Sequence, residues 1–416
     1  MFPDVTMKKV LTDIFRVCSR ELHLVFKDEG VLIFFFLLCA IYPVLYSIIY
    51  NPEVVRDEPM VVVDDCRTQF SRDFVRRLDA AQGVRVVGYA ASMQEAREAF
   101  SQKRAYAVLY IDRDFSADVV RNGKQGHVSL YCDMSVMMRY KAFLTALSDV
   151  QQEVGNELHA HTIEPFISQK GSIIKSRQVP VGNTAMGIAS AVLLFILPLV
   201  LQQSMLLGIG MLHGGSIERR RKNGGVDPMA IEAGTMATVL GKTLCHLVIY
   251  VLPTIYVLHY VPMMFGFPQH ANVWHELIIA VPFLIACSFM GQTLQAVVNE
   301  RESVFLLFVF SSVVFVFLVG ASWPRYLLST KWHAVANCVP STWMCNAYVL
   351  MQSGGAQLHH VAHYWRMLWL LCAVLFAFAY CVERFVNRRR YRIWQERSAA
   401  RPDALLRYDL IKNGIN

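Results

Sequence analysis

The chain has 416 residues, of which 55% are hydrophobic and only 17% are charged. A soluble domain has about 45–50% apolar and about 25% charged residues, so this composition excludes an ordinary soluble globular protein. The net charge of +8 lies entirely outside residues 51–180, which hold 17 basic and 17 acidic residues. Basic residues that flank apolar runs are typical of membrane proteins. The sequence shows no basic surface with a motif that reads nucleic acid, so we expect no nucleic-acid partner.

The chain begins with a predicted amphipathic helix at residues 8–27. Its apolar positions recur at helical spacing; they are Leu11, Ile14, Phe15, Cys18, Leu22 and Val25. We expect residues 1–30 to form a helix that lies in the inner membrane interface or packs on a partner. The first apolar run begins only near Val31, after Asp4 and Asp13, so we expect it to be retained as a signal anchor.

Six apolar and almost uncharged runs are long enough to cross a bilayer, which needs about 20 residues. They are residues 31–50, 181–212, 243–265, 277–298, 303–322 and 364–382. An even number of spans places both termini on one side, together with the basic residues 219–222 and the basic tail. We therefore expect an α-helical polytopic membrane protein with six transmembrane helices and cytoplasmic termini.

Residues 51–180 form a hydrophilic insert between the first and second spans. Strand candidates lie at Pro59–Val63, Val84–Tyr89, Ala105–Ile111 and His127–Cys132. Helical stretches separate them, and a long helix is predicted from about residue 135. Strands alternating with helices predict a small α/β domain with a partly parallel sheet, on the extracytoplasmic side. Cys66 and Cys132 could form a disulfide there, but spacing alone does not decide this.

A short basic segment with several glycines, residues 213–242, is predicted as a loop between the second and third spans. The positive-inside rule places it in the cytoplasm, where a soluble partner could push on it. Gly241-Lys242-Thr243 does not complete a phosphate-binding loop, because Met236 stands where the first glycine is required. We expect no nucleotide site in this chain, and we expect Lys242 to reach the membrane edge.

Residues 323–362, between the fifth and sixth spans, are too short and too broken to cross twice. They contain Trp323, Pro324 and Pro340. Two interpretations fit them: re-entrant helices in the outer leaflet that are buried by protein, or an external loop with an aromatic belt. The nearby His359, His360 and His363 have no cysteine or carboxylate at ligand spacing, so no metal site is predicted.

The predicted spans carry almost no charged residues, whereas ion-coupled pumps place such residues there. We therefore expect energy to come from outside the chain, and the substrate to be hydrophobic or amphipathic. Polar catalytic clusters are missing, which disfavours an enzyme. The alternative is a multi-span receptor with an extracytoplasmic ligand-binding domain, although a sensor would rarely need six uncharged spans.

Several short motifs, taken in order, resemble those of the membrane subunit of an ABC type-2 exporter with a large extracytoplasmic α/β domain. They are Phe26-Lys27-Asp28, Val61–Cys66, Ala107–Ile111, Ser216–Arg219 with Gly224-Gly225, Gly241-Lys242, Gly320–Pro324 and Val339–Thr342. The resemblance covers nearly the whole chain up to about residue 390. Within it, residues 181–390 would contain the second to sixth transmembrane helices. Residues 391–416, expected to form a basic cytoplasmic tail, have no counterpart in the family.

The resemblance implies a permease of the bacterial inner membrane that is driven by a separate ABC ATPase subunit. ATP and Mg would bind that partner, and this chain would need no cofactor. The permease would dimerise with a second copy of itself or with a paralogous permease, and it would contact membrane lipid. A periplasmic adaptor is a further candidate partner. The substrate stays open.

The resemblance also points to residues with particular roles. Glu218, Arg219 and Gly225 are predicted to couple the permease to the ATPase, Glu218 by pairing with a basic group and Gly225 by permitting a tight turn. The alternative is that the arginines only set the topology. Trp323, Pro324 and Pro340 are assigned to a re-entrant outer segment.

Overall fold

The computed structural model describes residues 7–49, 56–121, 126–132, 137–161, 188–223, 225–321, 323 and 325–399. The chain divides into two compact units. One consists of Met1–Asn51 with Pro180–Asn416, and the other is Pro52–Val179. The second unit differs by one residue at each end from the hydrophilic insert predicted at 51–180.

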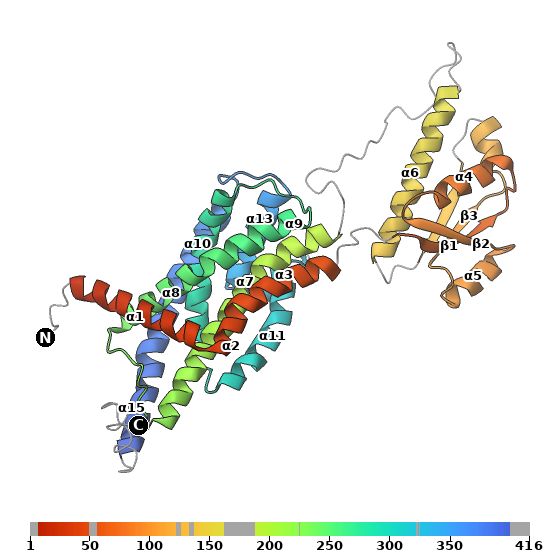
Figure 1. The fold of residues 1–416 in the computed structure, drawn as a ribbon. Helices are drawn as coiled ribbons and strands as arrows, with labels where there is room; N and C mark the ends of the chain where they lie inside the picture. Colours follow the sequence, from red (N-terminus) through yellow and green to blue (C-terminus); the bar gives the residue numbers. More distant parts are fainter. Residues whose placement is uncertain are drawn as a thin grey trace. The chain divides into compact units, whose positions relative to one another are not determined.

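The second unit is built on a four-stranded sheet with the order β2-β1-β3-β4. Strand β1 pairs in parallel with β2 and β3, whereas β4 is antiparallel to β3. The elements in chain order are β1 (Glu58–Asp64), α4 (Gln69–Asp79), β2 (Val84–Tyr89), α5 (Met93–Ser101), β3 (Ala107–Ile111), η2 (Ala117–Arg121), β4 (Val128–Cys132) and α6 (Met137–His161). The predicted partly parallel α/β sheet is thus confirmed (Figure 1).

Alternation along β1 explains why helices cover both faces of this sheet. Met60 and Val62 point to a core shared with α4 and α6, which includes the buried Phe143. Val61 and Val63 point the other way and pack with α5. Successive side chains of a strand alternate between faces, so one apolar run supplies two cores.

Neither Cys66 nor Cys132 takes part in a disulfide in the described part of the chain, so the pairing considered from the sequence is not formed. Cys66 follows Asp64, which pairs with Ile111 at one end of β3. Cys132 pairs with Ala107 at the other end. Four strand residues span about 13 Å, which is farther than the roughly 7 Å that a disulfide allows between Cα atoms.

The first unit is helical, and six helices in the described part of the chain are long and apolar enough to cross a membrane, as predicted. They are Glu29–Ile49, Val192–Lys222, Thr235–Met264, Val273–Leu294, Arg301–Val319 and Ala362–Ile393. The elements are α1 (Met7–Lys27), α2 (Glu29–Leu32), η1 (Ile33–Leu37), α3 (Leu38–Ile49), α7 (Ile188–Lys222), α8 (Thr235–Ile255), η3 (Tyr256–Tyr260), α9 (Val261–Met264), α10 (Val273–Leu294), α11 (Arg301–Val319), η4 (Arg325–Leu327), α12 (Thr330–Asn337), α13 (Pro340–Gln352), α14 (Ala362–Cys381), η5 (Val382–Asn387) and α15 (Arg388–Ala399).

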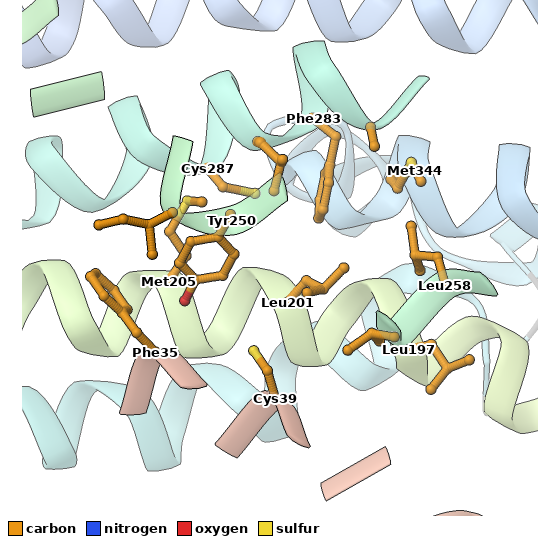
Figure 2. Packing of buried hydrophobic residues seen from close by; sticks show 14 of the residues in the cluster. Phe35, Cys39, Leu197, Leu201, Met205, Tyr250, Leu258, Phe283, Cys287 and Met344 are labelled. Atoms are coloured by element: carbon orange, nitrogen blue, oxygen red, sulfur yellow. The ribbon is translucent and has the colours of Figure 1, made fainter. Parts of the chain in front are cut away.

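Helix α7 lies at the centre of this unit and touches α3, α10, α11 and α13. Figure 2 shows Leu201 and Met205 along α7, with Phe35 approaching from the first apolar helix and Tyr250 and Phe283 from α8 and α10. The window of α7 that is apolar enough to span is 83% buried, against 22% for α11. Apolar burial on all sides is typical of a central helix.

The predicted loop over residues 213–242 is corrected at both ends. Helix α7 continues to Lys222, and α8 begins at Thr235, so only residues 223–234 lie between them. Gly214 lies inside the continuous helix. Its missing side chain lets the backbone of Arg301 approach, since a Cβ at Gly214 would lie 2.9 Å from that backbone. The basic residues 219–222 occupy the last turn, where cations favour the helix dipole.

The contact face of α1 differs from the predicted apolar face. Its buried residues are Val17, Glu21, Leu24 and Val25. Leu11 is 49% exposed and Phe15 is 63% exposed, although both were assigned to the apolar face. The apolar stripe is therefore wider than the surface that α1 buries in this unit.

Residues 323–362 form two short helices, α12 and α13, rather than one irregular loop. Helix α13 has 13 residues, which is about 20 Å and too short to span a bilayer. It packs on α7, α10, α11 and α14. The basic tail predicted from residue 391 begins inside α15, and its residues from 400 onwards lie outside the described part of the chain.

The core of the sheet unit gives a stability prediction for the full chain. Leu109 in β3 is fully buried, so Leu109→Ala should lower the free energy of unfolding of this unit by about 2–5 kcal/mol. Hydrogen exchange of peptides from β1 and β3 would measure the loss. Leu144→Ala on α6 is the control, because Leu144 is 43% exposed. Equal effects of the two substitutions would contradict the assigned core.

Candidate functional site

The loop between α7 and α8 is held by one buried carboxylate. The Asp227 side chain is fully buried. Its Oδ2 accepts a hydrogen bond from Nη2 of Arg20 on α1 at 3.3 Å, and its Oδ1 accepts one from Nε of Arg219 on α7 at 3.1 Å. The backbone N–H of Met229 donates to the same Oδ1 at 3.1 Å. Asp227 therefore joins α1, the end of α7 and the loop at one point.

This contact is energetically costly to break. Removing one partner of a buried ion pair typically costs about 3–5 kcal/mol, because the remaining charge is left without compensation. The Arg20 and Arg219 side chains are 16% and 29% exposed, so water offsets part of that cost here. Guanidinium groups stay charged at any physiological pH, so two of them converge stably only around an anion.

The turn that follows α7 depends on Gly225. Its φ is 91°, in the left-handed region that residues with a Cβ rarely adopt. Its N–H donates to the carbonyl oxygen of Arg220 at 2.7 Å and so satisfies one of the last carbonyls of the helix. The tight turn expected at Gly225 is present, and Asp227 lies two residues after it.

Helix α1 is attached to the helical unit at further points besides Arg20. It lies along α8 (Figure 1), and a Cβ built on Gly241 would lie only 2.7 Å from Cβ of Val17. Only glycine admits this approach without a shift. Beyond its end, Asp28 forms an ion pair with Arg301 at the start of α11. Force applied to α1 therefore reaches α7, α8 and α11.

The structure brings together the three residues predicted to couple the chain to an ATPase. Arg219 binds Asp227, and Gly225 forms the turn six residues later. Glu218 is partly exposed and has no hydrogen bond or ion pair with any residue that the structure describes. Their common location is established, while their role in coupling stays a prediction.

The residues predicted for the outer segment lie elsewhere. Trp323 is 52% exposed, and Pro324 lies outside the described residues. Pro340 is the first residue of α13, and the N–H of the next residue donates to Oε1 of Gln202 on α7 at 2.8 Å. Gln202 is about 25 Å along α7 from Arg219, so the two predicted groups form no single site.

Sequence reasoning missed Asp227 and its partner Arg20. The available signal was that Asp227 is the only acidic residue in the basic stretch 219–231, with Pro228 directly after it. A lone carboxylate among cations is a candidate ion-pair centre. Nothing local indicates Arg20, because it lies 207 positions earlier in the chain.

Comparison with known families gives this geometry its context. The model of the ABC-2 family transporter proteins matches residues 30–381. The chain belongs to the ABC-2 family transporter proteins. No curated protein matches it in sequence.

Membership of the ABC-2 family makes this chain a multi-pass membrane protein and the permease component of an ABC transporter. It implies an ABC ATPase partner, and such permease components are typically not catalytic. The match includes Arg219, Gly225 and Asp227 but begins after α1, so the Asp227 contact joins the matched region to a helix that precedes it.

The Asp227 contact gives a prediction about the loop. Asp227→Asn should remove the charge that holds Arg20 and Arg219, so residues 223–234 should open more easily by about 3 kcal/mol. Hydrogen exchange across the loop in the full-length permease would measure this. Glu232→Gln is the control, since Glu232 is exposed in the same loop. Equal protection in both variants would show that Asp227 does not hold the loop.

Proposed function

We propose that this ABC-2 permease moves a hydrophobic or amphipathic substrate out of the cytoplasm or the inner leaflet, powered by a separate ATPase that binds ATP and Mg²⁺. The observation that carries the proposal is the contact of Asp227 with Arg20 and Arg219. Through it, the loop at 223–234, α1 and α7 respond together to a partner that pushes on any one of them.

Helix α7 transmits the push. It has 35 residues and is about 50 Å long, so it extends beyond a hydrocarbon core of about 30 Å. Its basic end carries the coupling residues, and its remaining length packs on α3, α10, α11 and α13. ATP binding would close the ATPases, displace the loop and α1, and tilt α7 against these neighbours. The partly exposed Glu218 would pair with a basic group on the ATPase.

The chemistry of the spans supports an apolar or amphipathic substrate. Their buried polar groups are largely neutral and bonded to each other, for example His246 to Ser288 at 2.8 Å and Gln292 to Thr243 at 2.8 Å. The membrane interior disfavours unpaired charges, and these spans offer few cations or carboxylates to a charged cargo. A dimer with a second copy or a paralogous permease would enclose the path.

The proposed topology places both termini in the cytoplasm of a bacterium and residues 52–179 in the periplasm. The basic residues 219–222, 388–390 and Arg392 support this orientation, because they follow the positive-inside rule. Helices α12 and α13 would then dip into the outer leaflet as the re-entrant segment. The sheet unit would be free to gate the exit or to bind a periplasmic adaptor.

Purification from native membranes tests the proposal directly. The tagged permease should bring down a soluble ATPase, and the complex should hydrolyse ATP whereas the permease alone should not. In that complex, Glu218→Ala should leave assembly intact and lower substrate-stimulated hydrolysis by about tenfold, as expected for the loss of one charge-assisted contact.

Glu98→Ala is the matched control for Glu218→Ala. Glu98 is also an exposed helical carboxylate, but it lies in the sheet unit, which the ATPase would not reach. Its replacement should leave hydrolysis unchanged. Recovery of a signalling protein in place of an ATPase, or normal stimulation in Glu218→Ala, would count against the proposal.

The topology gives a separate prediction. Gln94→Cys in α5 should react with a membrane-impermeant maleimide in intact spheroplasts, because it is exposed in a unit proposed to face the periplasm. Lys222→Cys should react only after permeabilisation. The parent chain, with its own ten cysteines, supplies the background. The reverse pattern of labelling would invert the proposed orientation.

A further inference from the structure

A cavity of about 1010 Å³ lies at the basic end of the helical unit. Its walls come from α1, α7, α8, η5, α15 and the loop between α7 and α8. All of these belong to one compact unit. The volume is at the upper end of the roughly 300–1,000 Å³ that small-molecule sites occupy.

The charged residues that line this cavity have a basic excess. Six are basic and four are acidic: Arg20, Arg219, Arg220, Lys242, Arg388 and Arg392 against Glu21, Asp227, Glu232 and Glu383. Asp227 is already shared by two arginines. Lys242, which the sequence predicted to reach the membrane edge, lies 3.8 Å from Glu383 with its side chain 12% exposed. The remaining arginines are left without a carboxylate among the described residues.

Arg220 is the least compensated of these cations. The residue is only 9% exposed, and its Nε is buried without a hydrogen-bond partner. Its guanidinium lies over the ring of Tyr391, 3.7 Å from the centroid, and forms no ion pair within the described part of the chain. A ring face stabilises a cation, but it leaves the N–H donors unused.

His213 lies about two turns before Arg220 on α7 and also lines the cavity. It is 3% exposed, and its Nε2 has no partner among the described residues. Buried polar groups without partners are rare in proteins, because each costs free energy that a bond would recover. Two residues that carry such groups line one basic cavity, which is the arrangement expected of a site for an anionic ligand.

We propose that this cavity binds a phosphate group, carried either by an anionic lipid headgroup or by a soluble phosphate compound. The planar guanidinium of Arg220 presents paired donors that match two phosphate oxygens. His213 supplies a further polar contact, and Arg392 at the rim adds attraction. An ATPase side chain is a poorer occupant, since Arg220 and His213 are too deeply buried for a partner's surface to reach.

The proposal is independent of transport and of its direction, so it is tested on the full-length permease alone. The chain is placed in phosphatidylcholine nanodiscs and titrated with dioctanoyl phosphatidylglycerol, with dioctanoyl phosphatidylcholine or with inorganic phosphate. Saturable binding is followed by the rise in Tm, since a ligand of the folded state stabilises it. We expect phosphatidylglycerol or phosphate to raise Tm and phosphatidylcholine to leave it unchanged.

Arg220→Gln should weaken that binding about tenfold or more, the loss expected for a hydrogen bond to a charged group. Arg221→Gln is the matched control, because the neighbouring Arg221 is 51% exposed, pairs with Glu300 at 2.9 Å and does not line the cavity. Should Arg220→Gln fail to fold, Arg392→Gln offers a second variant at an exposed lining position, with an expected loss of about threefold.

The arms of the experiment separate the sources. Binding by phosphatidylglycerol that phosphate does not displace assigns a lipid headgroup, and displacement by phosphate assigns a soluble anion; both support the site. No saturable binding by either probe would overturn the proposal. So would equal losses in Arg220→Gln and Arg221→Gln, or unchanged anion binding in Arg220→Gln.

Discussion

The buried carboxylate of Asp227 is the contact on which the basic end of this permease depends. Arg20 comes from the first helix, Arg219 from the last turn of α7, and both are directed at the same side chain. Without an anion between them, their guanidinium groups would repel each other in a partly dehydrated site. The loop after α7 is therefore held by this charge in addition to the apolar packing of Met229, and the same charge adds an electrostatic contact to the packing of α1 on α8.

The length of α7 connects this contact to the rest of the helical unit. Ridges of apolar side chains around α7 meet four other helices, so a shift at its basic end is carried into the membrane-spanning core. The N–H that follows Pro340 bonds to Gln202 on the same helix. A single rigid element thus joins the region where a partner would act to the short helices near the opposite end, which is the arrangement that mechanical coupling requires.

Periodicity predicted the elements but not their long-range contacts. The alternating apolar runs were sufficient to predict the four strands of the sheet, and the uncharged apolar runs were sufficient to predict the six apolar helices. The prediction failed at 213–222, where Gly214 and Gly215 suggested a turn. Gly214 instead admits the backbone of Arg301. A glycine in a sequence can mark either a turn or a close contact between two segments, because both are favoured by the absence of a Cβ. The sequence alone does not distinguish the two cases.

The residues around the Asp227 contact were partly predictable for a similar reason. Gly225 and Arg219 could be found from the local motif, since a helix end needs a turn and cations favour it. Asp227 could not be chosen over other acidic residues as a structural contact, because one of its partners, Arg20, lies far away in the sequence. The contact face of α1 was likewise hidden: its apolar stripe is wider than the surface that α8 covers, and only the fold shows which part is used.

The three consecutive arginines show how one motif holds several functions. Neighbouring residues on an α-helix point about 100° apart, so a basic run cannot face one way. Arg219 turns to Asp227, Arg220 to Tyr391 and the cavity, and Arg221 to Glu300 at the surface. As a set they bias the topology, which needs only their charge. Individually they differ in burial and partners: the first pairs with a buried carboxylate, the second lies over an aromatic ring in the cavity wall, and the third forms a solvent-exposed ion pair.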